Sequence, residues 1–176
     1  MHHLQKVKND IVRGLHDYMG MPIVPTDTAG RKPNYPYMAY KITTPYEGNT
    51  FSLADEAVPS ENPKYDYDIK VTRKEQPHFT LSMSAYSDDE DKARDTAQQA
   101  ADWFKFIGYH YFVTCNIVVI STTNVTDRTQ QLVDDYERRY GFDVRIRAAR
   151  SISKRIEGME TFNFDSTINN PHPATQ

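Results

Sequence analysis

The sequence contains little of the material from which most active sites are built. Its one cysteine, Cys115, rules out an internal disulfide and cannot by itself complete a cysteine-based zinc site. The seven glycines are scattered, and none forms a phosphate loop of the GxxxxGK or GxGxxG type. A GxSxG nucleophile motif is also missing. These absences argue against several enzyme classes, although a Ser-His-Asp triad assembled from distant positions would leave no local signature.

The other candidates for chemistry have simpler explanations. No two of the six histidines have HExxH or HxH spacing within a predicted element; they are His2, His3, His16, His78, His110 and His172. The acidic run 88–91 would fan around a helix axis, so we expect a solvated helix start there and not a calcium or magnesium site. Cys115 is expected to be buried as a small apolar residue. We therefore predict no catalytic, cofactor-binding or metal-binding residue and no enzyme activity.

Long apolar runs, a signal-peptide pattern and an excess of basic residues are missing too. No run approaches the roughly 20 apolar residues that cross a bilayer, and the first residues do not resemble a signal peptide. The net charge of −3 argues against a dedicated nucleic-acid-binding protein. We expect a soluble intracellular protein with no membrane partner. The glycosylation-like triplet 124–126 is then fortuitous.

Two segments have the apolar periodicity of amphipathic helices. Residues 3–19 place apolar side chains at spacings of three and four, and Gly20 follows where a left-handed cap is common. A second helix is predicted from residue 87 or 88 to Gly108. Its buried stripe has small residues, which let a helix lie close to a sheet; the stripe consists of Ala93, Ala97, Ala100, Phe104 and Ile107.

Most of the remaining periodic segments alternate as strands do. We predict strands at 37–43, at 117–121 in the centre of the sheet, and at about 155–164. Residues 65–72 and 79–85 alternate on either side of a short polar turn, which predicts an antiparallel pair. Proline-containing segments 22–36 and 45–63 are predicted to be irregular loops. Residues 127–136 fit either a helical turn or extended chain.

Helices and strands segregate along the chain and do not alternate strictly. This order predicts an α+β fold in which two helices pack on one face of a mostly antiparallel sheet, with long Pro-rich loops. A length of 176 residues suits one domain, which we place at residues 1–164. Residues 165–176 contain Asn, Pro, Thr and His and are predicted to form a flexible tail.

The segment 136–147 is the most informative part of the chain. Phe142, Val144 and Ile146 alternate with charged residues, which predicts a strand with one buried and one charged face. Its arginines could pair with acids on another subunit, bind phosphates, or pair within the chain with neighbours such as Glu137 and Asp143. Subunit pairing is the favoured interpretation, and the acidic balance of the chain argues against phosphate binding. The candidate interface residues are Tyr136, Glu137, Arg138, Arg139, Arg145 and Arg147.

Three segments together resemble a known family. They are Lys32-Pro-Asn-Tyr-Pro-Tyr37 with Tyr40-Lys-Ile-Thr43, Ala100-Ala-Asp-Trp-Phe-Lys-Phe-Ile-Gly-Tyr109, and Tyr136-Glu-Arg-Arg-Tyr-Gly-Phe-Asp-Val-Arg-Ile-Arg147. They are similar to the neck or tail terminator proteins of tailed bacteriophages, a resemblance that covers most of residues 4–160. The block that begins at Tyr136 is the most specific part.

The resemblance implies a structural virion protein at the neck or tail junction, assembled in the host cytoplasm. It implies a ring, typically of six copies, that caps the tail tube, stops its growth and joins the tail to the head connector, while DNA passes through the channel without sequence-specific binding. No cofactor is implied. Tyrosine-rich edges and Pro-braced loops would suit the two different contact patches that a ring needs. Another head–tail connector or tail-completion protein is the main alternative, and a DNA-binding accessory factor a weaker one.

Overall fold

The computed structural model describes residues 3–27, 31–48, 50–131 and 136–157. The chain forms two compact units, the first comprising Met1–Ser52 and Arg73–Ser151 and the second Leu53–Thr72 and Ile152–Gln176. The expectation of a single domain over 1–164 stays a prediction. The predicted tail 165–176 lies outside the described residues.

A seven-stranded sheet forms the centre of the first unit. Its main path runs in the order β1 (Ile23–Pro25), β2 (Tyr37–Glu47), β5 (His78–Ser87), β9 (Tyr136–Ala148) and β6 (Ile117–Thr122). The short strands β7 (Thr126–Asp127) and β8 (Gln130–Gln131) also pair with β9. β1 joins β2 in parallel, and the other pairs are antiparallel. The predicted α+β class with a mostly antiparallel sheet is confirmed.

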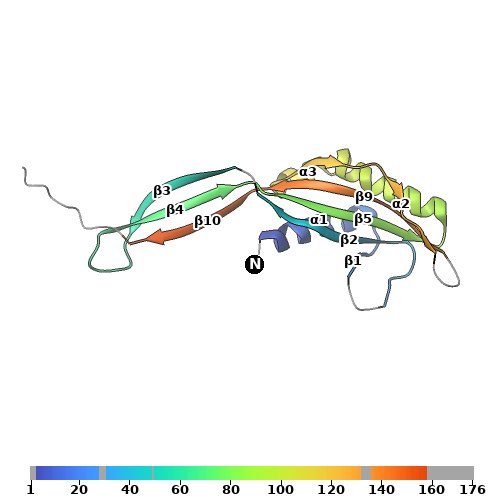
Figure 1. The fold of residues 1–176 in the computed structure, drawn as a ribbon, viewed down its shortest axis with the longest axis horizontal. Helices are drawn as coiled ribbons and strands as arrows, with labels where there is room; N and C mark the ends of the chain where they lie inside the picture. The colour runs from blue at the N-terminus through green and yellow to red at the C-terminus, as the bar shows by residue number, and fades with distance from the viewer. Residues whose placement is uncertain (1–2, 28–30, 49, 132–135, 158–176) are drawn as a thin grey trace, which may run out of the picture. The chain divides into compact units, whose positions relative to one another are not determined.

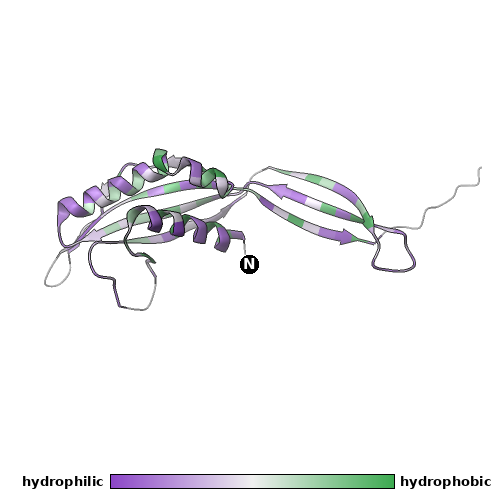
Figure 2. Ribbon diagram, turned by 180° about the vertical axis from the view of Figure 1, so that it is seen from behind, coloured by the Kyte–Doolittle hydropathy of each residue, from purple (hydrophilic) through white to green (hydrophobic). Residues whose placement is uncertain are grey.

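Helices cover one face of this sheet (Figures 1 and 2). α1 (His3–Met19) has the predicted bounds, and Gly20 adopts a left-handed φ of 65° after it. α2 (Glu90–Asp102) begins after Asp89, whose side chain accepts a hydrogen bond from the Lys92 amide. The acidic run therefore caps the helix, as predicted.

The second predicted helix does not continue to residue 108 in one piece. One π-helical turn, η1 (Trp103–Ile107), follows α2, and a short helix, α3 (Tyr109–Thr114), comes next. A π turn takes more residues than an α turn and therefore rotates the side chains that follow it. Ile107, predicted to be buried, is 49% exposed for this reason. Ala93, Ala97, Ala100 and Phe104 are buried as predicted.

The core lies between the helices and the large sheet. Its largest fully buried apolar side chains come from α1, β2, β5 and β9, namely Ile11, Leu15, Met38, Phe79, Leu81, Met83, Phe142, Val144 and Ile146. Each contributes about 1.5–3 kcal/mol when it is removed from water. This core holds the large sheet rigidly enough to position the residues on its opposite face.

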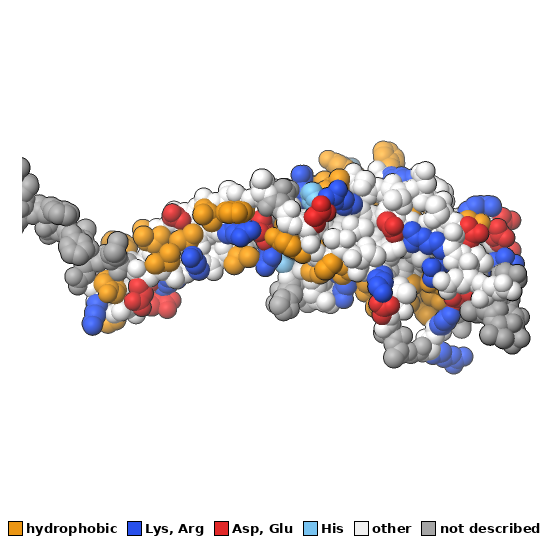
Figure 3. Space-filling model, in the orientation of Figure 1, with side chains coloured by type: hydrophobic (Ala, Val, Ile, Leu, Met, Phe, Trp, Pro, Cys, Tyr) orange, Lys and Arg blue, Asp and Glu red, His pale blue; other side chains and the backbone are white. Residues whose placement is uncertain are grey.

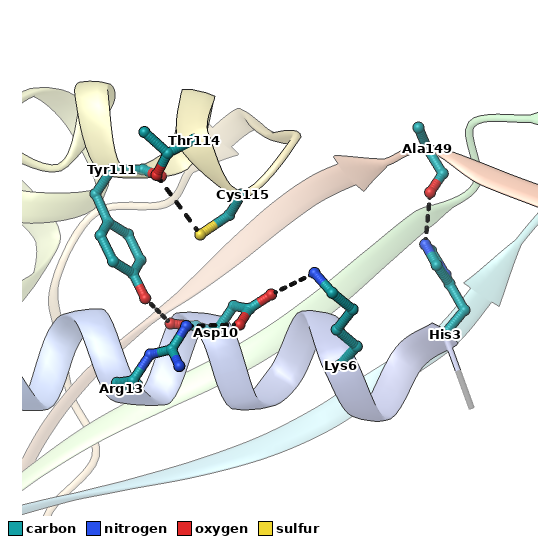
Figure 4. A network of polar contacts seen from close by, with 8 residues as sticks. All are labelled: His3, Lys6, Asp10, Arg13, Tyr111, Thr114, Cys115 and Ala149. Carbon is teal, nitrogen blue, oxygen red and sulfur yellow. Dashed lines mark hydrogen bonds and ion pairs between the residues drawn. The ribbon is translucent and has the colours of Figure 1, made fainter. Parts of the chain in front are cut away.

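α1 is held in place by contacts with α3 and with the sheet end (Figure 4). The Tyr111 hydroxyl donates a hydrogen bond of 2.7 Å to the backbone carbonyl of Asp10. The His3 ring lies 2.7 Å from the carbonyl of Ala149. Gly14 provides the space for the Tyr111 ring, because a Cβ at this position would lie only 2.3 Å from a ring carbon.

Several strand predictions are wrong. Residues 65–72 and 79–85 do not pair with each other, because β4 (Tyr67–Glu75) belongs to a different sheet from β5. The segment 45–63 is not an irregular loop, since β2 extends to Glu47 and β3 occupies Phe51–Pro59. Strand 117–121 forms as β6 but lies at the edge of the sheet. The last strand, β10 (Arg150–Ile156), begins earlier than predicted, and residues 158–164 of the predicted strand lie outside the described residues.

Strands β10, β4 and β3, in that order, form a three-stranded sheet that supplies the second unit. One face is polar. Here Ser60 donates a 2.8 Å hydrogen bond to the buried Asp68, and the hydroxyls of Thr72 and Ser153 lie 2.9 Å apart. The other face carries the apolar residues of the same strands, and Figure 3 shows hydrophobic and basic side chains gathered over them.

Candidate assembly surface

Strand β9 has the two faces that its sequence predicts. Phe142, Val144 and Ile146 are fully buried toward the helices, whereas Asp143, Arg145 and Arg147 are partly exposed on the opposite face. The register continues this opposite face across the sheet, since Asp143 pairs with Ser82 and Ser82 pairs with Lys41. We call this helix-free side of the large sheet the open face (Figure 3).

Ion pairs within the chain occupy much of the open face. The Arg145 guanidinium donates to Glu47 at 2.6 Å and to the Nδ1 atom of His78 at 3.1 Å. Arg128 donates to Ser82 at 2.7 Å and to Asp143 at 3.1 Å. These arginines are partly exposed, so each pair contributes about 0–1 kcal/mol and can exchange for an external acid at little cost.

The other end of the open face carries an aromatic stack. The Tyr37 and Tyr86 rings lie 4.8 Å apart and nearly parallel, at an interplanar angle of 2°. The Arg139 guanidinium donates to the Tyr86 hydroxyl at 3.2 Å and lies 5.7 Å from the centre of the Tyr86 ring. Beside the stack, Glu137 is buried and forms an ion pair with Lys32.

A pocket of about 500 Å³ opens over this stack. Tyr37, Ala39 and Tyr86 form its apolar floor, and cationic side chains from Arg31, Lys32 and Arg139 line it. Burial, with Glu137 as a smaller contributor, raises the pKa of Tyr37 well above its ordinary value. The hydrogen bond to Glu137 raises the pKa of Lys32. Both side chains therefore stay protonated at neutral pH, so the pocket has a net positive lining.

Sequence reasoning did not predict this pocket. The residues that form it come from 24–39, 86 and 137–139, which are distant in the chain and meet only through the β2–β5–β9 register. The alternation of Tyr37 and Ala39 with Met38 and Tyr40 was the available signal, because it places an aromatic residue on each face of one strand.

The six predicted interface residues do not share one environment. Three of the arginines have partners within the chain, but these differ from the expected ones: Arg138 lies 3.8 Å from Glu90, Arg139 contacts Tyr86, and Arg145 pairs with Glu47. Glu137 forms an ion pair with Lys32. The other two are Arg147, whose side chain makes no hydrogen bond or ion pair with any described residue, and Tyr136, whose backbone pairs with Gln131.

Nothing in the described part of the chain points to a reaction centre. No group of three or more His, Cys, Asp or Glu residues able to hold a metal ion occurs within the described ranges. Cys115 is half-buried and packs against the core, so it is less enclosed than predicted. Within those same ranges, no helix has both the length and the apolar character to cross a bilayer. What the open face offers is a surface for contact.

Comparison with known proteins gives one family. The family model described as "Phage neck terminator protein" matches residues 9–172, which is most of the chain and reaches into both compact units. No curated protein matches the sequence.

Proposed function

Because the chain belongs to the phage neck terminator protein family, whose role is structural, we propose that it forms a ring at the head-proximal end of the phage tail. In this proposal the ring contains six copies, stops growth of the tail tube and joins the tail to the head connector. The single observation that carries the proposal is the family match over residues 9–172. The neck location follows from the family, and assembly in the host cytoplasm is part of the proposal.

The open face supports a role in contact. Its arginines are paired with acids of the same chain at partly exposed positions, so an incoming acidic surface can compete for them without unfolding the subunit. Arg147 has no such internal competitor among the described residues. We assign Arg138, Arg139, Arg145 and Arg147, with Tyr136 and Glu137, to a contact with a neighbouring copy or with a sister component such as the tube protein or connector.

The charge of the chain is compatible with a channel through which DNA passes. A net charge of −3 provides no general attraction for phosphates, whereas proteins that hold duplex DNA neutralise many phosphates with Lys and Arg. A ring built from such subunits would let DNA slide without binding it in a sequence-specific way. Tight binding of the isolated protein to duplex DNA, with a steep salt dependence, would instead favour a DNA-binding accessory factor.

The decisive experiment is electron microscopy of particles assembled without this protein. The proposal expects tails of irregular length, or tails that fail to join heads, and it is wrong if normal joined particles form. Native mass measurement of the protein alone and mixed with tail tubes would show whether a ring forms and how many copies it contains. The same measurement would separate a ring from another tail-completion component that stays monomeric.

Charge reversal tests the residues assigned to the contact. Arg147→Glu should weaken joining while leaving the thermal stability of the subunit within about 0.5 kcal/mol, because a partly exposed side chain with no internal partner in the described chain is changed. Arg94→Glu on the exposed surface of α2 is a matched control that reverses an arginine elsewhere. Normal joining by Arg147→Glu would remove Arg147 from the interface.

A further inference from the structure

The second unit, with its three-stranded sheet, has no hydrophobic core of its own among its described residues. Among the described residues of this unit, Asp68 alone is buried. A small sheet of this kind normally needs a covered apolar face to be stable in water. Five large apolar side chains of the unit are instead exposed by 44% or more, and they are Leu53, Tyr67, Ile69, Ile152 and Ile156.

These five side chains share one face. Lys70 of β4 lies 3.9 Å from Glu56 of β3, and Thr72 of β4 contacts Ser153 of β10, which fixes the polar face. Because neighbouring strand residues point to opposite sides, the odd-numbered residues of β3 and β4 and the even-numbered residues of β10 point away from it. We call the set Leu53, Tyr67, Ile69, Ile152 and Ile156 the small-sheet apolar face.

The first unit carries a second exposed apolar surface. It includes a groove of about 460 Å³ between α3 and β6. Strand β6 ends the main path of the large sheet, so its outer edge has no neighbouring strand among the described residues. We call the exposed large apolar side chains of η1, α3 and β6 the groove patch. Four of them, Tyr109, Val113, Val118 and Ile120, line the groove, and the other two are Phe106 and Ile107.

Together the two surfaces contain eleven of the fourteen large apolar side chains that are exposed in the described chain. Their exposed fractions add up to about six whole side chains, or on the order of 1,000 Å² at roughly 150–250 Å² each. An area of this order is where specific protein–protein interfaces begin. Each surface alone exposes roughly half of this area, which is in the range where an exposed apolar patch often has a contact function.

Each surface also carries a charge that lacks a partner among the described residues, and the two charges are opposite. Asp55 lies on β3 and alternates with Leu53 onto the small-sheet apolar face. Lys105 lines the groove. Lys154 also points to the small-sheet apolar face but belongs to β10, so β4 separates it from Asp55. If a second copy meets the groove with its β3 edge, Asp55 of that edge therefore lies toward Lys105 of the groove.

We propose that the small-sheet apolar face of one copy docks, β3 edge first, onto the groove patch of a second copy. The two surfaces are different, so the contact is heterologous, and repeated copies either close into a ring or form a chain. This inference rests on the proposed ring and names the surfaces that build it. Val118 of the groove patch pairs with Arg147 at the sheet edge, and the rest of the open face is then left for a sister component of the particle.

Charge exchange tests the pairing directly. Asp55→Lys and Lys105→Asp should each raise the protein concentration needed for half-maximal assembly about three- to tenfold, since each places like charges opposite one another. The double variant should return this concentration to near the wild-type value. Failure of the double variant to recover, when each single variant assembles poorly, would overturn the pairing.

Apolar contacts can be tested on one strand with a matched control. Leu53→Asp should raise the half-assembly concentration at least about tenfold, because it places a charge in a desolvated contact. Ala54→Asp introduces the same charge at the next residue, which points to the polar face. This variant should change the half-assembly concentration less than about twofold. Equal effects of the two variants would count against the assigned face.

Cross-linking distinguishes the possible occupants. In a Cys115→Ala background, mixing Ile69→Cys with Ile120→Cys protein should give a cross-linked dimer, and neither variant alone should do so. Dimers from Ile69→Cys alone would show small sheets pairing with each other and would refute the proposal. The proposal is also refuted if the thiol of the monomeric Ile69→Cys protein reacts slowly with a thiol reagent and becomes fully reactive when residues 158–176 are deleted. In that case the chain's own terminus would cover the small-sheet apolar face.

Failure of the docking and failure of the ring give different results. A ring seen by native mass measurement on tail tubes, without the cross-link and without charge rescue, refutes these surfaces and leaves the ring intact. A chain that stays monomeric on tail tubes, together with normal joined particles in its absence, refutes the proposed function itself.

Discussion

Replacing Gly14 with alanine should have opposite effects on stability depending on one residue of another helix. Gly14 is buried in α1, and an added Cβ would lie 2.3–2.8 Å from three ring carbons of Tyr111. The ring cannot move away freely, because its hydroxyl is bonded to the Asp10 carbonyl and its face packs 5.9 Å from the Trp103 ring. The methyl group therefore displaces a side chain that anchors α1.

Three contributions determine whether Gly14→Ala raises or lowers the stability of the protein when Tyr111 is present. Alanine in a helix interior is favoured over glycine by about 1 kcal/mol. Forcing a methyl group into filled space costs about 1–3 kcal/mol, and losing the Tyr111 hydrogen bond costs about 1 kcal/mol more. Gly14→Ala should therefore destabilise the protein by about 1–3 kcal/mol, which lowers Tm by about 2–12 °C at this chain length.

The double-mutant cycle provides the control. In a Tyr111→Ala background the obstruction is gone, so Gly14→Ala should now raise Tm by about 2–4 °C through helix propensity alone. Thermal unfolding followed by circular dichroism measures all four proteins. A Gly14→Ala protein that is more stable than wild type in the presence of Tyr111 would refute the packing of α3 on α1 described here.

Two further predictions concern buried groups. Glu75 is buried and accepts from Arg73 at 3.0 Å and from Arg150 at 3.1 Å. Glu75→Gln should therefore lower the free energy of unfolding in urea by about 1–3 kcal/mol, whereas Glu47→Gln at an exposed pair should lower it by less than about 1 kcal/mol. Similar losses for the two variants would contradict the burial of Glu75. Burial raises the pKa of Tyr37 in the folded state. The stability that the neutral Tyr37 hydroxyl contributes is therefore present below pH 10 and is lost as the pH rises further, by up to about 1.4 kcal/mol per pH unit. Tyr37→Phe should flatten the fall of stability between pH 10 and 11, and an unchanged slope would show that Tyr37 does not titrate as described.

The sequence was sufficient for elements whose signal is local. α1 has its apolar stripe and its glycine stop within 20 residues, and both appear where predicted. The alternation of Phe142, Val144 and Ile146 with charged residues also placed each side chain of β9 on the correct face. In these segments periodicity and capping depend on near neighbours, so one stretch of chain contains the whole argument.

Strand pairing was not predictable in the same way. Residues 65–72 and 79–85 alternate like two strands of one hairpin, but alternation gives the faces of a strand and says nothing about its partner. β4 belongs to a second sheet, whose apolar side is exposed. β6 looked central because it is apolar, although it lies at an edge where Val118 and Ile120 are exposed.

The candidate site was predicted only in part for a related reason. The arginines of β9 were found from sequence, but their partners Glu47, Tyr86 and Glu90 lie at least 48 positions away. The aromatic pocket over Tyr37 and Tyr86 depends on two strand registers and has no contiguous signature. A surface made by three strands at once is the kind of feature that one strand's sequence cannot reveal.

An exposed apolar edge strand usually invites uncontrolled association. In this chain the large sheet has a complete core of its own, whereas the second unit has none among its described residues. Folding of the first unit therefore does not depend on a partner, but full order in the small sheet does, if the docking proposed above is correct. Such a subunit would gain stability from its neighbour only when a second copy is correctly placed, and the free energy of covering the small-sheet apolar face would then drive ring closure. These separate roles of the two units explain how the chain can expose the eleven large apolar side chains of the two proposed surfaces and still be directed toward one assembly.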